Sequence, residues 1–169
     1  MRRRDWGFAK DKLDELYGAY DSISTEDLLI RSHWIRYLIV ITSGFMETSV
    51  RMFYTQYAED KSSPKVHSFV LERLDRPGNM RMDKLLRLVG EFDRDWRCEI
   101  ESHSDFARLK ASLNSLVTLR NSIAHGENVN TGMVQLKSYY DDVVIVLEML
   151  FSQCDRDSNT QRLRRGSGR

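Results

Sequence analysis

The sequence predicts an all-α fold, and three observations support that prediction. Apolar residues recur every three or four positions over most of the chain, which is the period of a helix with one buried face. Only two prolines occur in 169 residues, so long helices can form without interruption. No segment shows the alternation of apolar and polar residues that is typical of a strand. At this length we expect one domain whose core needs neither disulfides nor metal.

The first predicted helix covers residues 5–20, where apolar and aromatic side chains recur at helical intervals. Ser24, with an acidic residue three positions later, resembles a capping box, so a second helix is expected to begin there. Its apolar stripe continues from Leu28 to Tyr57. The other faces of its middle are apolar too, and carry Trp34, Tyr37, Leu38, Val40, Ile41 and Phe45. We therefore expect that middle to be buried all round.

Two shorter helices are expected in the centre of the chain. Ser63–Pro64 has the residue types of an N-cap and a first helical position, and the helix that it begins extends to about Leu74. Residues 76–79, with the sequence RPGN, predict a turn that ends this helix. The segment 82–92 predicts a further helix. Residues 93–104 have no clean period and predict an irregular connection.

Two long helices are expected to close the domain. They cover residues 106–125 and 133–151, and the polar segment 128–132 predicts the loop between them. We assign residues 1–153 to a single all-helical domain. Residues 154–169 are rich in arginine and poor in apolar residues, which is the composition of a disordered basic tail.

The net charge of +1 is unevenly distributed. Residues 1–5 carry three Arg and one Asp, and residues 155–169 carry five Arg and two Asp, so the rest of the chain is net negative. A net-negative body argues against tight, non-specific binding of nucleic acid. The two basic ends are either solubilising tails or arms that bind phosphate, and composition does not decide between these interpretations.

The sequence is typical of a cytoplasmic protein. Cys98 and Cys154 lack a C-x-x-C partner, which predicts neither a disulfide framework nor a zinc knuckle. The N-terminal arginines are not followed by the apolar stretch of a signal peptide. The longest uncharged apolar run, YLIVITSGFM, is too short to span a bilayer, so no membrane association is expected.

An arginine lies within the apolar stripe of the 106–125 helix. At about 100° per residue, Leu113 and Leu116 lie within about 40° of Leu109, and Arg120 lies at about 20° from it. His125 lies at about 160°, and therefore points away from Arg120 unless the last turn unwinds. Burial of an unpaired guanidinium costs several kcal/mol, so Arg120 is expected to face a carboxylate, backbone carbonyls or a bound anion.

Two interpretations of residues 120–126 remain open on spacing alone. In the first they only end the helix: Arg120 pairs with a buried acid, His125 lies near the last carbonyls, and Gly126 adopts the left-handed conformation of a C-terminal cap. In the second they form a phosphate site, in which the guanidinium of Arg120 holds the anion and the imidazole of His125 transfers protons near neutral pH.

The segment LVTLRNSIAHG resembles the signature of the HEPN superfamily, which has an arginine, a polar residue and then a histidine at the end of a bundle helix. Arg120, Asn121 and His125 match these three positions. The segment RYLIVITSGFMETSVRMFYTQYA is similar to the helix of the RiboL-PSP-HEPN branch that contains an apolar run, SGF and an acidic position, which is Glu47 here. With the closing helix, the resemblance covers roughly residues 24 to 152.

The resemblance implies a HEPN-type helical bundle with additional short helices, and a homodimer in which two copies of the 106–125 helix form one metal-independent ribonuclease site. It further implies that His125 acts as acid or base, that Arg120 stabilises the transition state, and that Asn121 orients the histidine or the phosphate. Glu47 would hold Arg120 in position. The products would be a 2′,3′-cyclic phosphate and a 5′-hydroxyl. Many members of the superfamily are toxins or defence effectors, which implies a cognate antitoxin or regulatory partner.

Alternatives remain for each of these residues. Glu47 is four positions before Arg51 and would form an ordinary helix ion pair with it. His33, His67 and His103 are isolated, so neither a metal nor another cofactor is expected. The alternative function is a non-catalytic helical dimer that binds RNA, a nucleotide or a partner protein through the same groove.

Overall fold

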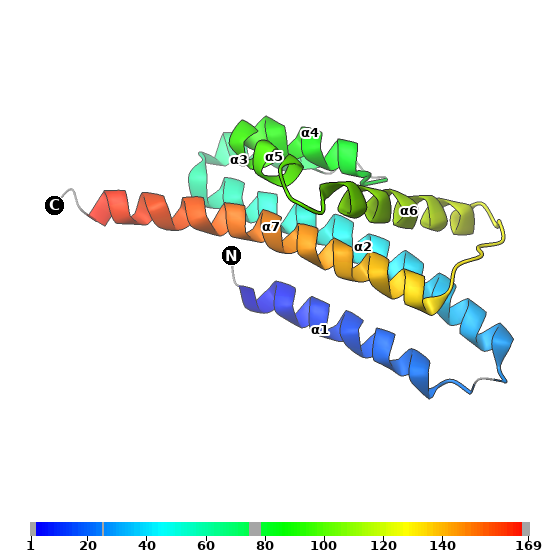
Figure 1. Cartoon of the computed structure of the whole chain (residues 1–169). Coiled ribbons are helices and arrows are strands. Elements are labelled where there is room, and N and C mark those ends of the chain that lie inside the picture. The colour runs from blue at the N-terminus through cyan, green and yellow to red at the C-terminus, as the bar shows by residue number, and fades with distance from the viewer. Residues whose placement is uncertain (1–2, 25, 75–78, 167–169) are drawn as a thin grey trace.

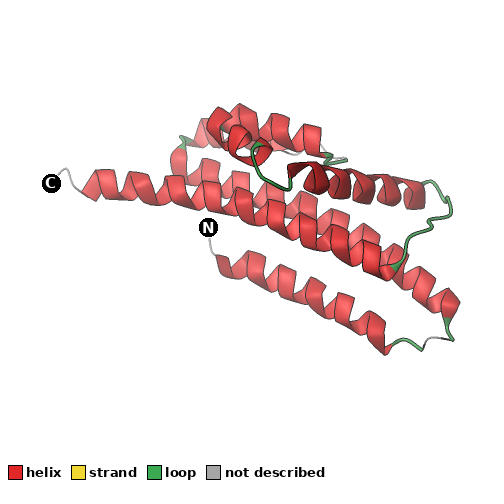
Figure 2. Cartoon of the chain, in the orientation of Figure 1, coloured by secondary structure: helices red, strands yellow, loops and turns green. Residues whose placement is uncertain are grey.

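The computed structural model describes residues 3–24, 26–74 and 79–166. These residues form seven α-helices, one short 3-10 helix and no strand. Figure 2 colours the helices red and the loops between them green. In chain order the elements are α1 (Arg3–Ala19), η1 (Tyr20–Ser22), α2 (Leu28–Lys61), α3 (Pro64–Leu74), α4 (Met82–Phe92), α5 (Arg94–Glu101), α6 (Phe106–Ala124) and α7 (Met133–Gly166). The predicted all-α fold is confirmed.

The two longest helices, α2 and α7, form the centre of the bundle. Each has 34 residues, which corresponds to about 50 Å of helix. Helix α7 packs against both α2 and α6, and α1 packs against α2. In Figure 1, α1 lies below the α2–α7 pair and α6 lies above it, while α3, α4 and α5 gather over the end at which α2 finishes. The four longest helices thus form a bundle, and the short helices are added at one end.

Aromatic side chains from three helices meet in the core. The indole of Trp6 in α1 packs against the rings of Phe53 in α2 and Phe151 in α7, with ring centroids 5.9 and 6.2 Å away. All three side chains are buried. Each aromatic pair stabilises the fold by about 0.5–1.5 kcal/mol beyond the area it buries. This cluster fixes α1 to the central pair of helices.

A buried carboxylate sets the rotation of α6 on α7. Asp142 of α7 is 1% exposed and accepts a hydrogen bond from Ser112 Oγ of α6 at 2.5 Å. Its other carboxylate oxygen accepts a hydrogen bond from the guanidinium of Arg108, one turn earlier in α6. A buried charge needs such partners, because an unpaired one is strongly destabilising. The two bonds hold one face of α6 toward α7 and set the direction of every other side chain on α6.

The segment 93–104 is not the irregular connection that its lack of periodicity predicts. It contains α5, which has only eight residues. Asp93 caps this helix, since its side chain accepts hydrogen bonds from two backbone N–H groups of the first turn at 2.7 and 3.2 Å. Ile100 is fully buried. A two-turn helix with a side-chain cap and one buried anchor is too short to show a helical period in the sequence.

Helix α2 differs from its prediction at two places. It begins at Leu28 with Asp27 as N-cap, whereas the hydroxyl of Ser24 accepts a hydrogen bond from the N–H of Glu26 at 3.3 Å and does not cap the helix. Its middle is also not buried all round in the single chain, because Tyr37 is 44% and Val40 is 41% exposed. The middle of α2 therefore has more apolar side chains than α1, α6 and α7 bury.

Helix α7 continues to Gly166, beyond the domain boundary that composition predicts after residue 153. Asp157 accepts a hydrogen bond from the hydroxyl of Tyr57 in α2 at 3.0 Å, and Arg156 forms an ion pair with Glu99 of α5 at 2.7 Å. These contacts extend the helix although the segment has few apolar residues. Residues 76–78 of the predicted turn and residues 167–169 of the predicted tail lie outside the described residues.

Candidate active site at the end of helix α6

Helix α6 ends as the sequence predicts, in a left-handed glycine cap. His125 is the C-cap residue and Gly126 has a φ of 74°, which glycine adopts at little cost. The N–H of Gly126 donates to the carbonyl of Ile123 at 3.0 Å, and the N–H of Glu127 donates to the carbonyl of Ser122 at 2.8 Å. This pair of bonds is a Schellman motif. It fixes the backbone of His125 while leaving the imidazole exposed.

Arg120 lies on the side of α6 that carries the buried residues Leu113, Leu116 and Val117, and it is itself half-buried. Its Nη1 donates to Asn121 Oδ1 at 3.3 Å. Among the described residues no carboxylate lies within ion-pair distance of its guanidinium. A half-buried guanidinium with one long hydrogen bond to a neutral amide lacks the anion that would offset its desolvation.

Glu47 is half-buried in α2. It is seven residues before Tyr54 and therefore lies on the same side of the helix; the ring of Tyr54 packs against Phe92 of α4 at 4.4 Å. Helix α2 also packs against α6. Within the described part of the single chain Glu47 forms no ion pair with Arg120, so its supporting role stays a prediction.

The single chain brings Arg120 and Asn121 together but does not direct His125 toward Arg120. His125 is five positions after Arg120, which corresponds to about 140° around the helix. Because the backbone of His125 still has a near-helical conformation, with φ of −89° and ψ of 6°, this angular separation is retained. One copy of α6 therefore presents a cation on one side and a proton-transfer group on the other.

Comparison with known proteins assigns the fold to a family. The RiboL-PSP-HEPN family profile matches residues 5–156, which is most of the chain. The chain belongs to the RiboL-PSP-HEPN family. Searches of curated proteins and of solved structures found no match to this chain. Membership confirms the resemblance seen in the sequence and supports a role related to RNA or to nuclease chemistry.

The HEPN domain also has a stripe of neutral polar residues on α6 that sequence reasoning missed. Asn114, Thr118, Asn121 and His125 follow one another at spacings of four, three and four residues, which places them on one face of the helix. Exposed faces of helices usually carry Lys and Glu, so a stripe without either is a recognisable signal in the sequence.

A polar cavity of about 410 Å³ lies beside this stripe. Its lining comes from the polar face of α6, the loop after α6, the first turns of α7 and the residue before α4, and includes Arg81, Asn114, Thr118, Asn130, Gln135 and Tyr139. The guanidinium of Arg81 donates to the hydroxyl of Thr118 at 2.9 Å. In the described part of the chain, no Asp or Glu lines this cavity. One side of the cavity is formed by α6, the helix that contains Arg120 and ends at His125.

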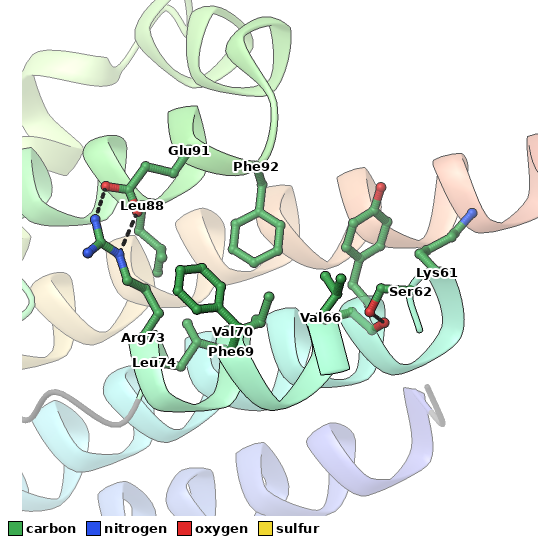
Figure 3. A pocket seen from close by; sticks show the side chains of 12 residues that line it. Lys61, Ser62, Val66, Phe69, Val70, Arg73, Leu74, Leu88, Glu91 and Phe92 are labelled. Carbon is green, nitrogen blue, oxygen red and sulfur yellow. Dashed lines mark hydrogen bonds and ion pairs between the residues drawn. The ribbon is translucent and has the colours of Figure 1, made fainter. Parts of the chain in front are cut away.

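A second cavity of the HEPN domain, of about 340 Å³, lies between α3 and α4. Figure 3 shows Phe69 and Val70 of α3 facing Phe92 of α4, with the ion pair of Arg73 and Glu91 at one end. Its lining is almost entirely apolar and includes none of the residues of the Arg120–His125 motif.

Other reactive groups of the HEPN domain form no competing site in the described part of the chain. No three His, Cys, Asp or Glu side chains there are grouped as metal ligands would be. Burial raises the pKa of the Cys154 thiol to about 12, so this cysteine stays protonated near neutral pH. His103 accepts a hydrogen bond from the N–H of Asp105 at 3.1 Å and shapes the turn before α6. No described helix is long and apolar enough to cross a bilayer.

Proposed function

We propose that this HEPN domain is a metal-independent endoribonuclease whose active site is assembled from two copies of the chain. The observation that carries this proposal is the guanidinium of Arg120, which is half-buried and has no carboxylate partner among the described residues. A phosphate of RNA supplies the missing anion, and a guanidinium binds phosphate through two parallel hydrogen bonds. The exposed imidazole of His125 supplies the proton transfer.

Two copies are needed because Arg120 and His125 point in different directions on one helix. When two α6 helices face each other across a two-fold axis, Arg120 of one copy and His125 of the partner subunit converge on one phosphate. One His125 removes the proton from the ribose 2′-OH, whose oxygen attacks the adjacent phosphorus. The bond from phosphorus to the 5′-oxygen breaks, and the leaving oxygen takes a proton from the second His125. The products are a 2′,3′-cyclic phosphate and a 5′-hydroxyl.

In this proposal the remaining groups stabilise the transition state or position the reacting groups. Arg120 stabilises the negative charge that develops on the phosphorane-like transition state. Asn121, whose Oδ1 already accepts a hydrogen bond from Arg120, orients the phosphate or the imidazole. Glu47 positions Arg120 once the dimer forms, because both side chains are half-buried on helices that pack together.

An exposed apolar surface on α2 supports the proposed dimer. Leu29, Ile30, Tyr37 and Val40 are each more than 40% exposed, and they lie on the helix that packs against α6. At about 100° per residue these four side chains lie within about 100° of one another around α2, and exposed apolar side chains gathered on one side of a helix mark an interaction surface. The patch would extend the contact between two α6 helices toward the roughly 800 Å² per partner that a stable interface buries.

Light scattering tests the dimer. At tens of micromolar, the wild-type chain should have about twice its single-chain mass of 19.9 kDa. Val40→Glu should shift the mass to that of one chain and abolish cleavage, because it places a charge in the apolar contact. Phe8→Glu is the matched control, since Phe8 is also exposed, at 62%, but lies on α1. A strict monomer of the wild type, with and without RNA, would remove the composite site.

The proposed biological role is that of a toxin or defence effector, restrained by a partner that blocks the composite site. Expression of the wild-type chain in a bacterial host should stop growth, because this form cleaves cellular RNA. Expression of His125→Ala should not stop growth, because the variant lacks the imidazole needed for cleavage. Colony counts after induction measure this effect, with immunoblots to confirm equal amounts of protein. Equal growth with both forms at equal amounts would contradict the toxin role.

A further inference from the structure

The polar cavity beside α6 has the geometry of a binding site that extends the Arg120–His125 motif. Thr118, in its lining, and His125 are seven residues apart, so they lie two turns apart on the same face of α6. The separation along the helix axis is about 10 Å. A ligand in the cavity would therefore not occupy the position of the scissile phosphate, but a neighbouring part of the same ligand would reach His125.

The cavity offers the hydrogen-bonding groups that a nucleobase requires. The amide side chains of Asn130 and Gln135 each present a donor and an acceptor, and neither makes a side-chain hydrogen bond with the described residues. The Oδ1 of Asn114 accepts the N–H of Met82 at 3.0 Å, which leaves its amide NH₂ as a donor. Nucleobase edges combine donors and acceptors in the same way.

An aromatic ring and a single positive charge complete the lining. Tyr139 is half-buried and lies one turn after Gln135 on α7. Its aromatic side chain lines the cavity together with Leu119, so the lining contains apolar surface as well as amides. Unpaired bases of RNA stack on such rings. Of the described lining residues Arg81 alone is charged, and its guanidinium suits a phosphate of the same strand.

Charge favours a nucleic-acid ligand over a peptide or a cation. The chain has 25 Asp and Glu residues, yet among the residues that the structure describes none lines this cavity. By contrast, the neighbouring surface around Asp83, Glu101 and Lys110 mixes both signs of charge. A cavity that is neutral apart from one arginine repels no phosphate and lacks the carboxylates that a cation or a basic peptide would need.

We propose that this cavity binds a nucleobase of single-stranded RNA next to the cleaved phosphate, and thereby selects the sequence that is cut. This inference rests on the proposed ribonuclease function, since it places a base subsite beside His125. Gln135 and Asn130 read the edge of the base, Tyr139 stacks on its face, and Arg81 binds a phosphate of the same strand.

Binding of labelled ten-nucleotide RNAs by the full-length His125→Ala protein tests the subsite without cleavage. Fluorescence anisotropy is measured with oligo(A), oligo(C) and oligo(U), and with the DNA equivalents. Adding Tyr139→Ala should weaken RNA binding by about 5- to 150-fold, which corresponds to the loss of one stacked base. Gln135→Ala should change the ratio of affinities among the three RNAs. Arg81→Ala should weaken all three equally and lower the salt dependence by about one phosphate contact.

Val134→Ala is the matched control, because Val134 is 88% exposed in the same turn of α7 and does not line the cavity. Thermal melting shows whether Tyr139→Ala still folds, and the exposed Gln135 provides a second variant if it does not.

The outcomes separate the subsite from the proposed function. If the wild type cleaves RNA but Gln135→Ala and Tyr139→Ala keep the affinity and base ratio of the His125→Ala parent, the subsite is wrong and the ribonuclease stands. If the cavity variants weaken RNA binding in a protein that never cleaves, the subsite stands and the ribonuclease is wrong. If the His125→Ala protein binds no RNA, the cavity serves another ligand, such as a partner protein, and the proposal is overturned.

Discussion

Replacing His125 with alanine should lower RNA cleavage by about 10²–10⁴-fold, which is the usual contribution of a general acid or base. The fold should not change, because the side chain is exposed and the Schellman bonds of Gly126 and Glu127 use only backbone atoms. The measurement is cleavage of total RNA by the purified dimer, with end-group analysis for the 2′,3′-cyclic phosphate. Cleavage by the wild type should persist in EDTA, since the proposed chemistry uses an imidazole and a guanidinium.

His103→Ala is the control for loss of an imidazole, since His103 lies in the turn before α6 and takes no part in the proposed site. It should retain wild-type cleavage, and melting curves should show both variants folded. Equal cleavage by wild type and His125→Ala would point to a contaminating nuclease. No cleavage by a folded wild-type dimer would favour the non-catalytic alternative.

Replacing Arg120 with alanine should lower cleavage by about 10²–10³-fold, through loss of the charge that stabilises the transition state. Because Arg120 has no carboxylate partner among the described residues of the single chain, its removal leaves no buried acid unpaired there, and the monomer should be no less stable. Arg120→Lys keeps the charge but not the planar fork, so it should recover only part of kcat. Single-turnover cleavage and thermal melting measure the two effects.

Arg73→Ala is the matched control, because Arg73 forms an exposed ion pair with Glu91 on α3 and α4, away from the motif. Loss of stability without loss of activity in Arg120→Ala would assign this arginine a purely structural role.

Glu47→Gln separates positioning from chemistry: it should lower kcat less than Arg120→Ala does. Wild-type kcat and KM in Glu47→Gln would remove the supporting role of Glu47.

The end of α6 was predictable from the sequence because its signals are local. The apolar stripe fixes the buried face of the helix, and a glycine after the last periodic residue fixes its end, so Gly126 adopts the predicted left-handed conformation. Helix α5 was not predictable, since one buried Ile100 and one capping Asp93 do not make a period. The contacts of Arg156 and Asp157 in α7 with α5 and α2 come from the tertiary fold, which composition does not reveal.

The candidate site was only partly predictable for the same reason. The motif of Arg120 and His125 lies on one helix, and their divergence follows from five residues of helical rotation. The partner of Arg120 depends on tertiary contacts, which spacing along one helix does not reveal. Among the described residues of the single chain its guanidinium bonds to Asn121, where a carboxylate, backbone carbonyls or a bound anion was expected. The polar cavity combines residues as distant in sequence as Arg81 and Tyr139, which no spacing rule brings together.

The buried carboxylate of Asp142 limits how much the direction of Arg120 varies from one molecule to the next. A slip of α6 by one residue would turn Arg120 by about 100° and shift it by about 1.5 Å. Such a slip would also break the bond from Ser112, and a hydrogen bond to a charged group contributes about 1.5–3 kcal/mol. Slipped forms are thereby reduced roughly ten- to hundred-fold in the ensemble. Nearly every molecule then presents Arg120 in one direction, so in the proposed dimer both chains would meet with this side chain already oriented.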